Sequence, residues 1–333
     1  SYAFYFFFFS GSYFYKGTWV SLKNCRPVQQ TLIIGVIFEK VGGHLLFLVP
    51  WIFAFMTFAG SLSINFEGLK TLKKYPKFIF ITILFLHVLM PIWAYVLSAL
   101  IVNDHLLTVG FILSVAVPTG VTSFIWINIC KGNIPLGLSI ILIDTILSPL
   151  IIPLIAKLAA GQIVAIDTTS IMIDLLWMIA FPSMLGMLMN EWGKSEFVKK
   201  LSRTFAPFQK VSIFLIVFIN SSVIAPYLKN ISWDIVGIIL LVLVVSLSGY
   251  TFCLIIGHFL WRRIDLITTF VFTGGMRNIA VGVVVASTYF PSRVVLPVVF
   301  GMLFQQVLAS QFSKGLEKYR EKFNLNVGNE VKS

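Results

Sequence analysis

Three ionisable residues stand deep inside long apolar segments of this sequence, where their side chains could bind an anion or carry a proton. They are Arg277, Asp144 and His87. A charged side chain in hydrocarbon costs about 3 kcal/mol or more, so each is expected to face a protein interior or a watery cavity. Counted at roughly 1.5 Å per helical residue, all three lie at similar depth in their segments. The sequence therefore predicts an internal binding site.

Hydroxyl and amide side chains gather at two places where a helix is expected to break. The segments Pro118-Thr119-Gly120 and Thr273-Gly274-Gly275 each interrupt an apolar stretch, and Arg277 follows the second. Polar side chains at such breaks can satisfy the freed backbone groups, and they can also bind a solute. The candidates for either role are Thr119, Thr122, Ser123, Thr273 and Asn278.

The composition indicates that the segments carrying these residues lie in a membrane. The chain has 333 residues, of which 58% are hydrophobic and only 11% are charged. Soluble domains carry about twice that charged fraction. The sequence contains no Walker A loop, zinc motif or Ser/His/Asp set, so we expect no enzyme and no cofactor. The net charge of +12 fits basic cytoplasmic loops better than nucleic-acid binding.

Hydropathy and turn residues predict ten transmembrane helices. Their expected ranges are 27–41, 44–64, 77–101, 104–130, 134–157, 169–190, 208–228, 234–260, 266–288 and 292–313. If both termini are cytoplasmic, the basic residues fall on the cytoplasmic side except for Lys40, Lys157, Lys229, Arg277 and Arg293. This bias supports the layout and a multi-pass protein of the plasma membrane, with the lipid bilayer as its surroundings.

Ten helices divide into two sets of five, and an odd number in each set makes the second set inverted. We expect an N-terminal segment over 1–26, one repeat over about 27–157, a second over about 169–313, and a cytoplasmic tail over 314–333. The two predicted breaks fall in the fourth helix of each set. Broken helices at matching positions of two repeats are the best sequence indication of a transporter site.

The two breaks and their surroundings resemble the bile acid:sodium symporter superfamily. The similarity covers roughly residues 45–312. The matching features are Pro50–Phe58, the loop Glu67–Pro76, Pro118, Gly120, Ser123, Lys131-Gly132-Asn133, Ser148-Pro149, Pro153, Gly275-Met276, Asn278 and Tyr289-Phe290-Pro291. The resemblance implies an all-α fold of two inverted five-helix repeats, with a panel bundle, a core bundle, and broken helices four and nine that cross in the core. It also makes Gln305, in the tenth helix, a further candidate.

The same resemblance implies organic anions as substrates and two sodium ions as the driving force, but the expected sodium ligands are largely replaced. Phe124 stands where the family has an asparagine, Leu86 where it has a glutamine, and Gly137 and Ile141 where it has hydroxyls. The Glu-x-Gly-x-Gln motif of the ninth helix reads Thr273 to Arg277. A protonated arginine would repel a nearby sodium ion, so we expect no bound metal.

In the family fold the regions around Asp144 and Arg277 lie close together. We therefore expect Asp144 to pair with Arg277 or to face it across a small water-filled site. The pair could merely fix the core. Alternatively, Arg277 could bind a substrate carboxylate while Asp144 carries a coupling proton. His87 could be a proton relay or a hydrogen-bonded packing residue.

These features favour a secondary transporter of a small organic anion that works by alternating access. Sodium coupling is not expected, and proton coupling or uncoupled exchange would take its place. The alternative is a membrane protein of the same fold that senses a metabolite without transporting it, or that acts like a channel. Substrate flux distinguishes the two, because a sensor binds its ligand without exchange.

Overall fold

The computed structural model describes residues 31, 34–62, 73–161, 166–193, 195–229 and 233–330. The predicted N-terminal segment over 1–26, residues 27–30 and 32–33 of the predicted first helix, and most of the loop Glu67–Pro76 lie outside these residues. Within the described part, all regular secondary structure is helical, apart from one isolated pair of bridged residues. The all-α expectation is thereby confirmed, whereas the ten-helix inverted repeat remains a prediction.

The first half of the chain contains helices that are interrupted more often than the sequence predicts. They are α3 (Glu39–His44), the short 3₁₀ turn η2 (Leu46–Leu48), α4 (Val49–Ser61), α6 (Pro76–Leu84), the π-helical turn η3 (Phe85–Leu89), α7 (Met90–Ile101), α8 (His105–Ala116), α9 (Ser123–Ile129) and α10 (Ile134–Ala160). The segment α6–η3–α7 is continuous, so the predicted helix over 77–101 is present with a π turn inside it.

The described part of the second half is also helical. It comprises α11 (Thr168–Leu175), the π-helical turn η4 (Leu176–Ala180), α12 (Phe181–Trp192), α13 (Ser195–Lys229), α14 (Trp233–Leu260), α15 (Ile264–Gly275), α16 (Ile279–Tyr289) and α17 (Ser292–Glu330). The helix predicted over 208–228 begins earlier and forms part of α13. The helix predicted over 292–313 runs without a break into the predicted tail.

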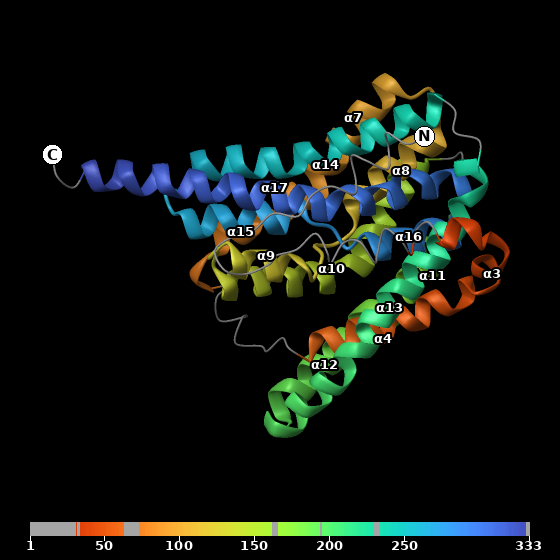
Figure 1. Cartoon of the computed structure of the whole chain (residues 1–333), viewed down its shortest axis with the longest axis horizontal. Helices are drawn as coiled ribbons and strands as arrows, with labels where there is room; N and C mark the ends of the chain where they lie inside the picture. The colour runs from red at the N-terminus through yellow and green to blue at the C-terminus, as the bar shows by residue number, and fades with distance from the viewer. Residues whose placement is uncertain are drawn as a thin grey trace.

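Two groups of helices pack separately. α3, α4, α12 and α13 contact one another and form a slanting group at the lower right of Figure 1. η3, α7 to α10 and α14 to α17 form the larger group, in which α8 packs against α7, α10 and α17. α10 contacts α11 and η4, and α13 contacts α17, so the groups also touch each other. The larger group contains both broken helices and Arg277, Asp144 and His87.

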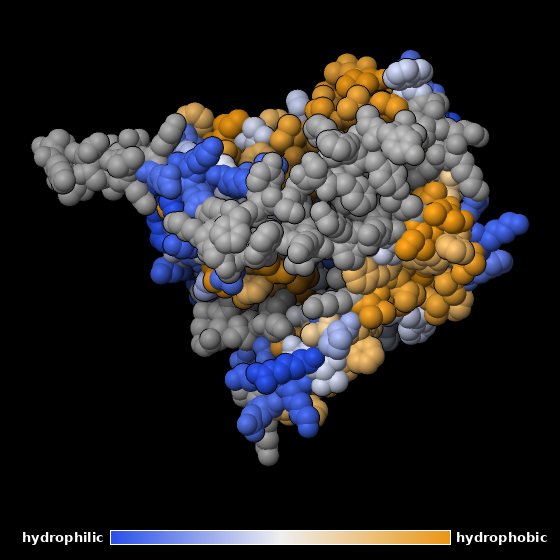
Figure 2. All heavy atoms as spheres, in the orientation of Figure 1, coloured by the Kyte–Doolittle hydropathy of each residue, from blue (hydrophilic) through white to orange (hydrophobic). Residues whose placement is uncertain are grey.

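The surface exposes many large apolar side chains, unlike the surface of a soluble protein. Large apolar side chains such as Phe80, Leu100, Leu158 and Phe259 are exposed by 67% to 80%. Figure 2 shows extensive apolar patches between hydrophilic clusters at the ends of the molecule. By length and composition, five helices of the described part could each cross a membrane, and four shorter helices are also apolar. The hydrophobic effect would hold such a surface in lipid rather than in water.

Candidate functional site

The first helix break lies between α8 and α9. Pro118 disfavours a helical conformation at Val117, whose backbone is extended, so α8 ends at Ala116. α9 does not begin until Ser123. The segment 117–122 therefore carries backbone groups with no partners in their own helix, as the sequence predicts for the Pro-Thr-Gly motif.

The second break lies between α15 and α16, and it falls slightly later than predicted. α15 continues through Thr273, Gly274 and Gly275, and the helix opens at Met276. Thr273 is helical, and its hydroxyl donates to the carbonyl of Thr269 at 2.9 Å. Gly275 serves close packing instead of the break, since a Cβ there would overlap the ring of Tyr250. The interruption itself is the short segment Met276–Asn278.

Backbone groups of the two breaks form hydrogen bonds with each other. Thr119 and Arg277 form an antiparallel bridge. The Gly120 N–H donates to the Met276 carbonyl at 3.1 Å, and the Asn278 N–H donates to the Pro118 carbonyl at 2.6 Å. A Cβ at Gly120 would lie 2.9 Å from the Arg277 carbonyl oxygen, so this approach requires glycine. The ends of α8, α9, α15 and α16 therefore meet at one point.

Asp144 is fully buried in α10 and is bound by two other elements. One carboxylate oxygen accepts the backbone N–H of Thr119 at 2.6 Å. The other lies 2.5 Å from Nε2 of His87, in the π turn η3. Thr119 in turn donates its hydroxyl to the Thr273 carbonyl at 2.9 Å. Asp144 thus connects η3 and α10 to both breaks.

The predicted ion pair between Asp144 and Arg277 is not formed, so that form of the prediction is wrong. The carboxylate oxygens lie with Thr119 and His87, whereas the Arg277 atoms Nη1 and Nη2 are buried and have no hydrogen-bond partner. The physical reason is geometric: the N–H groups freed at the first break reach the carboxylate directly. His87, predicted as either a relay or a packing residue, is the side-chain partner of Asp144.

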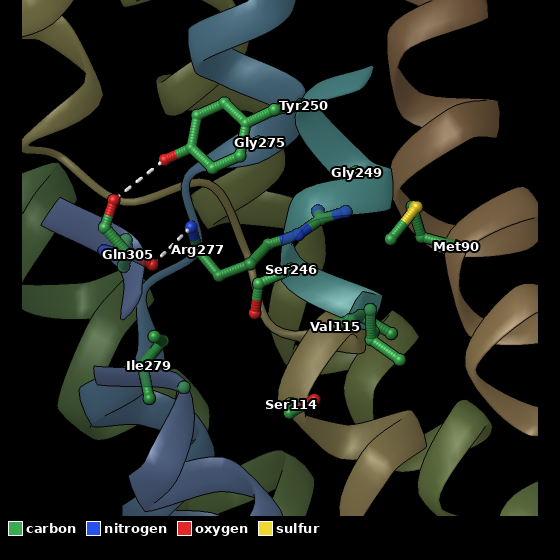
Figure 3. Close-up of a pocket in the computed structure, with 13 residues that line it drawn as sticks. Met90, Ser114, Val115, Ser246, Gly249, Tyr250, Gly275, Arg277, Ile279 and Gln305 are labelled. Atoms are coloured by element: carbon green, nitrogen blue, oxygen red, sulfur yellow. Dashed lines mark hydrogen bonds between the residues drawn. The ribbon is translucent and has the colours of Figure 1, made fainter. Parts of the chain in front are cut away.

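Arg277 is held by its backbone and extends its side chain into a cavity. Its N–H donates to Oε1 of Gln305 at 3.0 Å, and the Gln305 carbonyl accepts the Tyr250 hydroxyl at 3.1 Å. Figure 3 shows the guanidinium reaching from the break toward α14, near Gly249 and Met90. The residue is only 5% exposed. Its cationic group is therefore positioned by the fold and left unpaired among the described residues.

The cavity beside Arg277 has about 30 Å³ of space for water-sized molecules. Its wall comes from α7, α8, α14, α15, α16 and α17, and includes Met90, Ser114, Ser246, Tyr250, Ile279 and Gln305. Sequence reasoning anticipated Arg277 and Gln305 but missed Ser114, Ser246 and Tyr250. Ser246 and Tyr250 share one face of α14, and Ser114 stands in α8. Neither apolar helix carries a motif here, so the sequence offers no signal that the two helices meet beside Arg277.

The remaining predicted residues lie at the crossing but differ in their contacts. Thr122 and Asn278 are half-buried and precede α9 and α16, without capping those helices through their side chains. The Ser123 hydroxyl is buried and has no hydrogen-bond partner among the residues that the structure describes. The structure thus brings all of these residues near one place, while only Arg277 and Gln305 line the cavity.

At most of the positions expected to hold sodium, the side chain offers no oxygen ligand. Leu86 and Ile141 are buried apolar residues, and Phe124 is half-buried. At Gly137 the space that a side chain would need is filled by Ile127. Within the described residues, no three His, Cys, Asp or Glu side chains are placed to share a metal ion.

Comparison with known proteins agrees with this geometry. Residues 50–231 match the model of the Sodium Bile acid symporter family, which is more than half of the chain. The uncharacterized protein YbaS of Bacillus subtilis (strain 168) is 44% identical over 293 residues, covering 88% of this chain and 96% of the relative. The same organism's "Uncharacterized sodium-dependent transporter YocS" is 24% identical over 294 residues, covering 85% and 90%.

A chloroplastic relative from Oryza sativa subsp. japonica, named a probable sodium/metabolite cotransporter, is 25% identical over 232 residues. That similarity covers 69% of this chain and 56% of the relative. The match to the family model, the paired helix breaks and the apolar surface agree with one another. The chain therefore belongs to the sodium bile acid symporter family, a family of multi-pass membrane transporters.

Proposed function

We propose that this protein is a secondary transporter of small organic anions, and that Arg277 binds the carboxylate of the substrate. The observation that carries the proposal is the buried guanidinium whose Nη1 and Nη2 have no partner and which borders a cavity. A guanidinium presents two parallel N–H donors to a carboxylate, which makes this pairing strong and directional.

The backbone around Arg277 supports an anion site in a second way. Ile279 begins α16 and lines the same cavity, so the N-terminal end of that helix lies beside the guanidinium. Helix N-termini carry partial positive charge and unpaired N–H groups, both of which attract anions. Ser114 and Ser246 supply hydroxyls on the cavity wall that could bind a second polar group of the substrate.

The cavity is small, and this bears on how the substrate would enter. About 30 Å³ accommodates only water-sized molecules. Binding of an organic acid therefore requires the helices around the crossing to separate. The smaller group of α3, α4, α12 and α13 would move against the larger group and expose the crossing to one side of the membrane at a time. This is alternating access about a fixed site.

We further propose that sodium is not the coupling ion, although relatives carry sodium in their names. Leu86, Phe124 and Ile141 supply no oxygen ligand where the family resemblance places one, and the Arg277 cation stands in the same region. The basic residues support a plasma-membrane protein whose two ends are both cytoplasmic.

Exchange in proteoliposomes tests the proposal. Purified protein would be reconstituted with unlabelled monocarboxylates inside, and uptake of labelled pyruvate, lactate or acetate measured with and without sodium. We expect exchange that sodium does not stimulate, and an Arg277→Gln variant with at least about tenfold slower exchange, since a charge-assisted pair is lost.

The matched control is Arg293→Gln. Arg293 pairs with Asp104 at 2.9 Å near a helix end and is half exposed, so its loss should leave exchange nearly unchanged. Absence of exchange for every monocarboxylate would overturn the transport proposal, and steep stimulation by sodium would overturn the coupling proposal. Binding without exchange would indicate a sensor on the same fold.

A further inference from the structure

The contact between His87 and Asp144 cannot exist without a proton in it. Nε2 of His87 and the carboxylate oxygen of Asp144 are 2.5 Å apart and both buried. Two bare acceptors at that distance would repel each other, so one proton lies between them. The other carboxylate oxygen accepts the Thr119 N–H. In this arrangement the pair shares one proton, and the second carboxylate oxygen lies against the first helix break.

The second ring nitrogen of His87 is available for another proton. Nδ1 is buried and has no hydrogen-bond partner in the part of the chain that the structure describes. His87 lies in the π turn η3, a distortion of the helix that is often found at functional sites. A proton from water that reaches Nδ1 would convert the imidazole to imidazolium without disturbing the bond from Nε2 to Asp144.

The electrostatic surroundings of the pair are simple. The elements packed against η3 and α10 carry few other titratable side chains, and these lie near helix ends or at the surface. They are Lys77, Tyr95, His105, Lys157, Asp174 and Asp265. At the centre, among the described residues, the charges facing the pair reduce to that of Arg277, whose backbone is bridged to Thr119.

Charge balance links this pair to the anion site. Without substrate, the positive Arg277, the negative Asp144 and a neutral His87 sum to zero. A bound monocarboxylate would make the centre negative, and a net charge at this depth is costly. A proton on Nδ1 of His87 restores neutrality. The proton and the anion should therefore bind together and leave together.

We propose that the His87–Asp144 pair is the proton-binding site that couples to anion transport, so that one proton accompanies each monocarboxylate. The inference rests on the proposed function, because it takes the anion on Arg277 as given. Thr119 connects the two sites physically. Its N–H binds Asp144, and its backbone bridge holds Arg277 in place.

Calorimetric titration of the purified full-length protein with pyruvate, lactate and acetate tests the coupling. Each titration would be run in two buffers with different ionisation enthalpies, since the difference in heat reports the protons taken up on binding. We expect about one proton to be taken up per bound anion, and the affinity for the anion to fall as the pH rises. This readout needs no variant.

Two variants locate the proton. His87→Gln retains a side-chain donor for Asp144 but removes Nδ1, so binding should persist with proton uptake reduced to near zero. His258→Gln is the control, because that histidine lies at the far end of α14 and contacts Tyr319. Its proton uptake should equal that of the unmodified protein.

The outcomes separate the two proposals. Binding of a monocarboxylate without proton uptake by the unmodified protein would overturn the coupling and leave the anion site intact. Undiminished uptake in a folded His87→Gln variant would overturn the assignment to this pair. Failure of all three acids to bind would overturn the proposed function on which the coupling depends.

Discussion

Asp144 and Arg277 face the same crossing of broken helices but are held in opposite ways. Both carboxylate oxygens of Asp144 have partners, one from the backbone of the first break and one from His87. Arg277 is fixed through its backbone N–H, while Nη1 and Nη2 of its side chain are buried without partners. The difference shows that a buried charged group with hydrogen-bond partners in the protein stabilises the fold, whereas one without such partners is available for a ligand.

The largest effect on stability should come from removing the Asp144 carboxylate. Asp144→Leu leaves the Thr119 N–H without an acceptor and His87 without its partner, which should cost about 3 kcal/mol. Thermal unfolding of the purified variant in detergent would measure the loss. Asp144→Asn keeps an acceptor oxygen and should lose clearly less. Equal stability of Asp144→Leu and the unmodified protein would show that the carboxylate does not hold the crossing.

Adding a methyl group where the two breaks touch tests whether their close approach matters for stability and for anion binding. In Gly120→Ala the new Cβ would lie 2.9 Å from the Arg277 carbonyl oxygen, so the backbone must shift. We expect about 1–3 kcal/mol of destabilisation together with weaker anion binding. Gly237→Ala is the control, since a Cβ there meets no atom within 4 Å. Comparable losses in both variants would indicate that the close approach is unimportant.

The Gln305 amide tests whether the backbone of Arg277 must be held for the side chain to bind. Gln305→Ala removes the acceptor 3.0 Å from the Arg277 N–H and should weaken anion binding by roughly tenfold, equivalent to about 1.4 kcal/mol. The neighbouring Gln306 accepts from the Trp126 indole at 3.1 Å and does not line the cavity. Gln306→Ala should therefore leave binding unchanged, and an equal effect of both substitutions would contradict this role.

The ion pair near the start of α8 provides a reference for the effect of the buried charges on stability. Asp104 accepts the N–H groups of Leu106 and Leu107 at the start of α8 and also pairs with Arg293. Asp104→Asn keeps a capping oxygen and loses the pair, so we expect less than about 1 kcal/mol of lost stability, smaller still in high salt. A loss as large as that of Asp144→Leu would remove the contrast between exposed and buried charge.

The sequence predicted the helical fold and the two breaks, because proline, glycine and an isolated arginine leave local signals. It placed the second break slightly too early, since Thr273 and Gly275 also suit a helix that packs closely against Tyr250. The partner of Asp144 could not be predicted. Which way a buried side chain points depends on how η3, α10 and the first break pack together, and equal depth in the membrane does not determine that.

The same limit explains why the wall of the cavity could not be predicted from the sequence. Tyr250 and Ser246 come from α14 and Ser114 comes from α8, which is far away in the chain, and each looks like an ordinary packing residue in its own segment. Their meeting around Arg277 depends on long-range contacts of α8, α14 and α17. Local patterns therefore identified the charged centre of the site but not its wall.

The most direct test of the account measures stability and binding together on one Arg277→Gln sample. Among the described residues, Nη1 and Nη2 of Arg277 make no hydrogen bond that the substitution would remove, so we expect the unfolding temperature to change little. Binding of labelled pyruvate in sodium-free buffer should weaken by roughly 100-fold, because the charged donors are gone. A lower unfolding temperature with unchanged binding would contradict the account, since Arg277 would then serve the fold and not the anion.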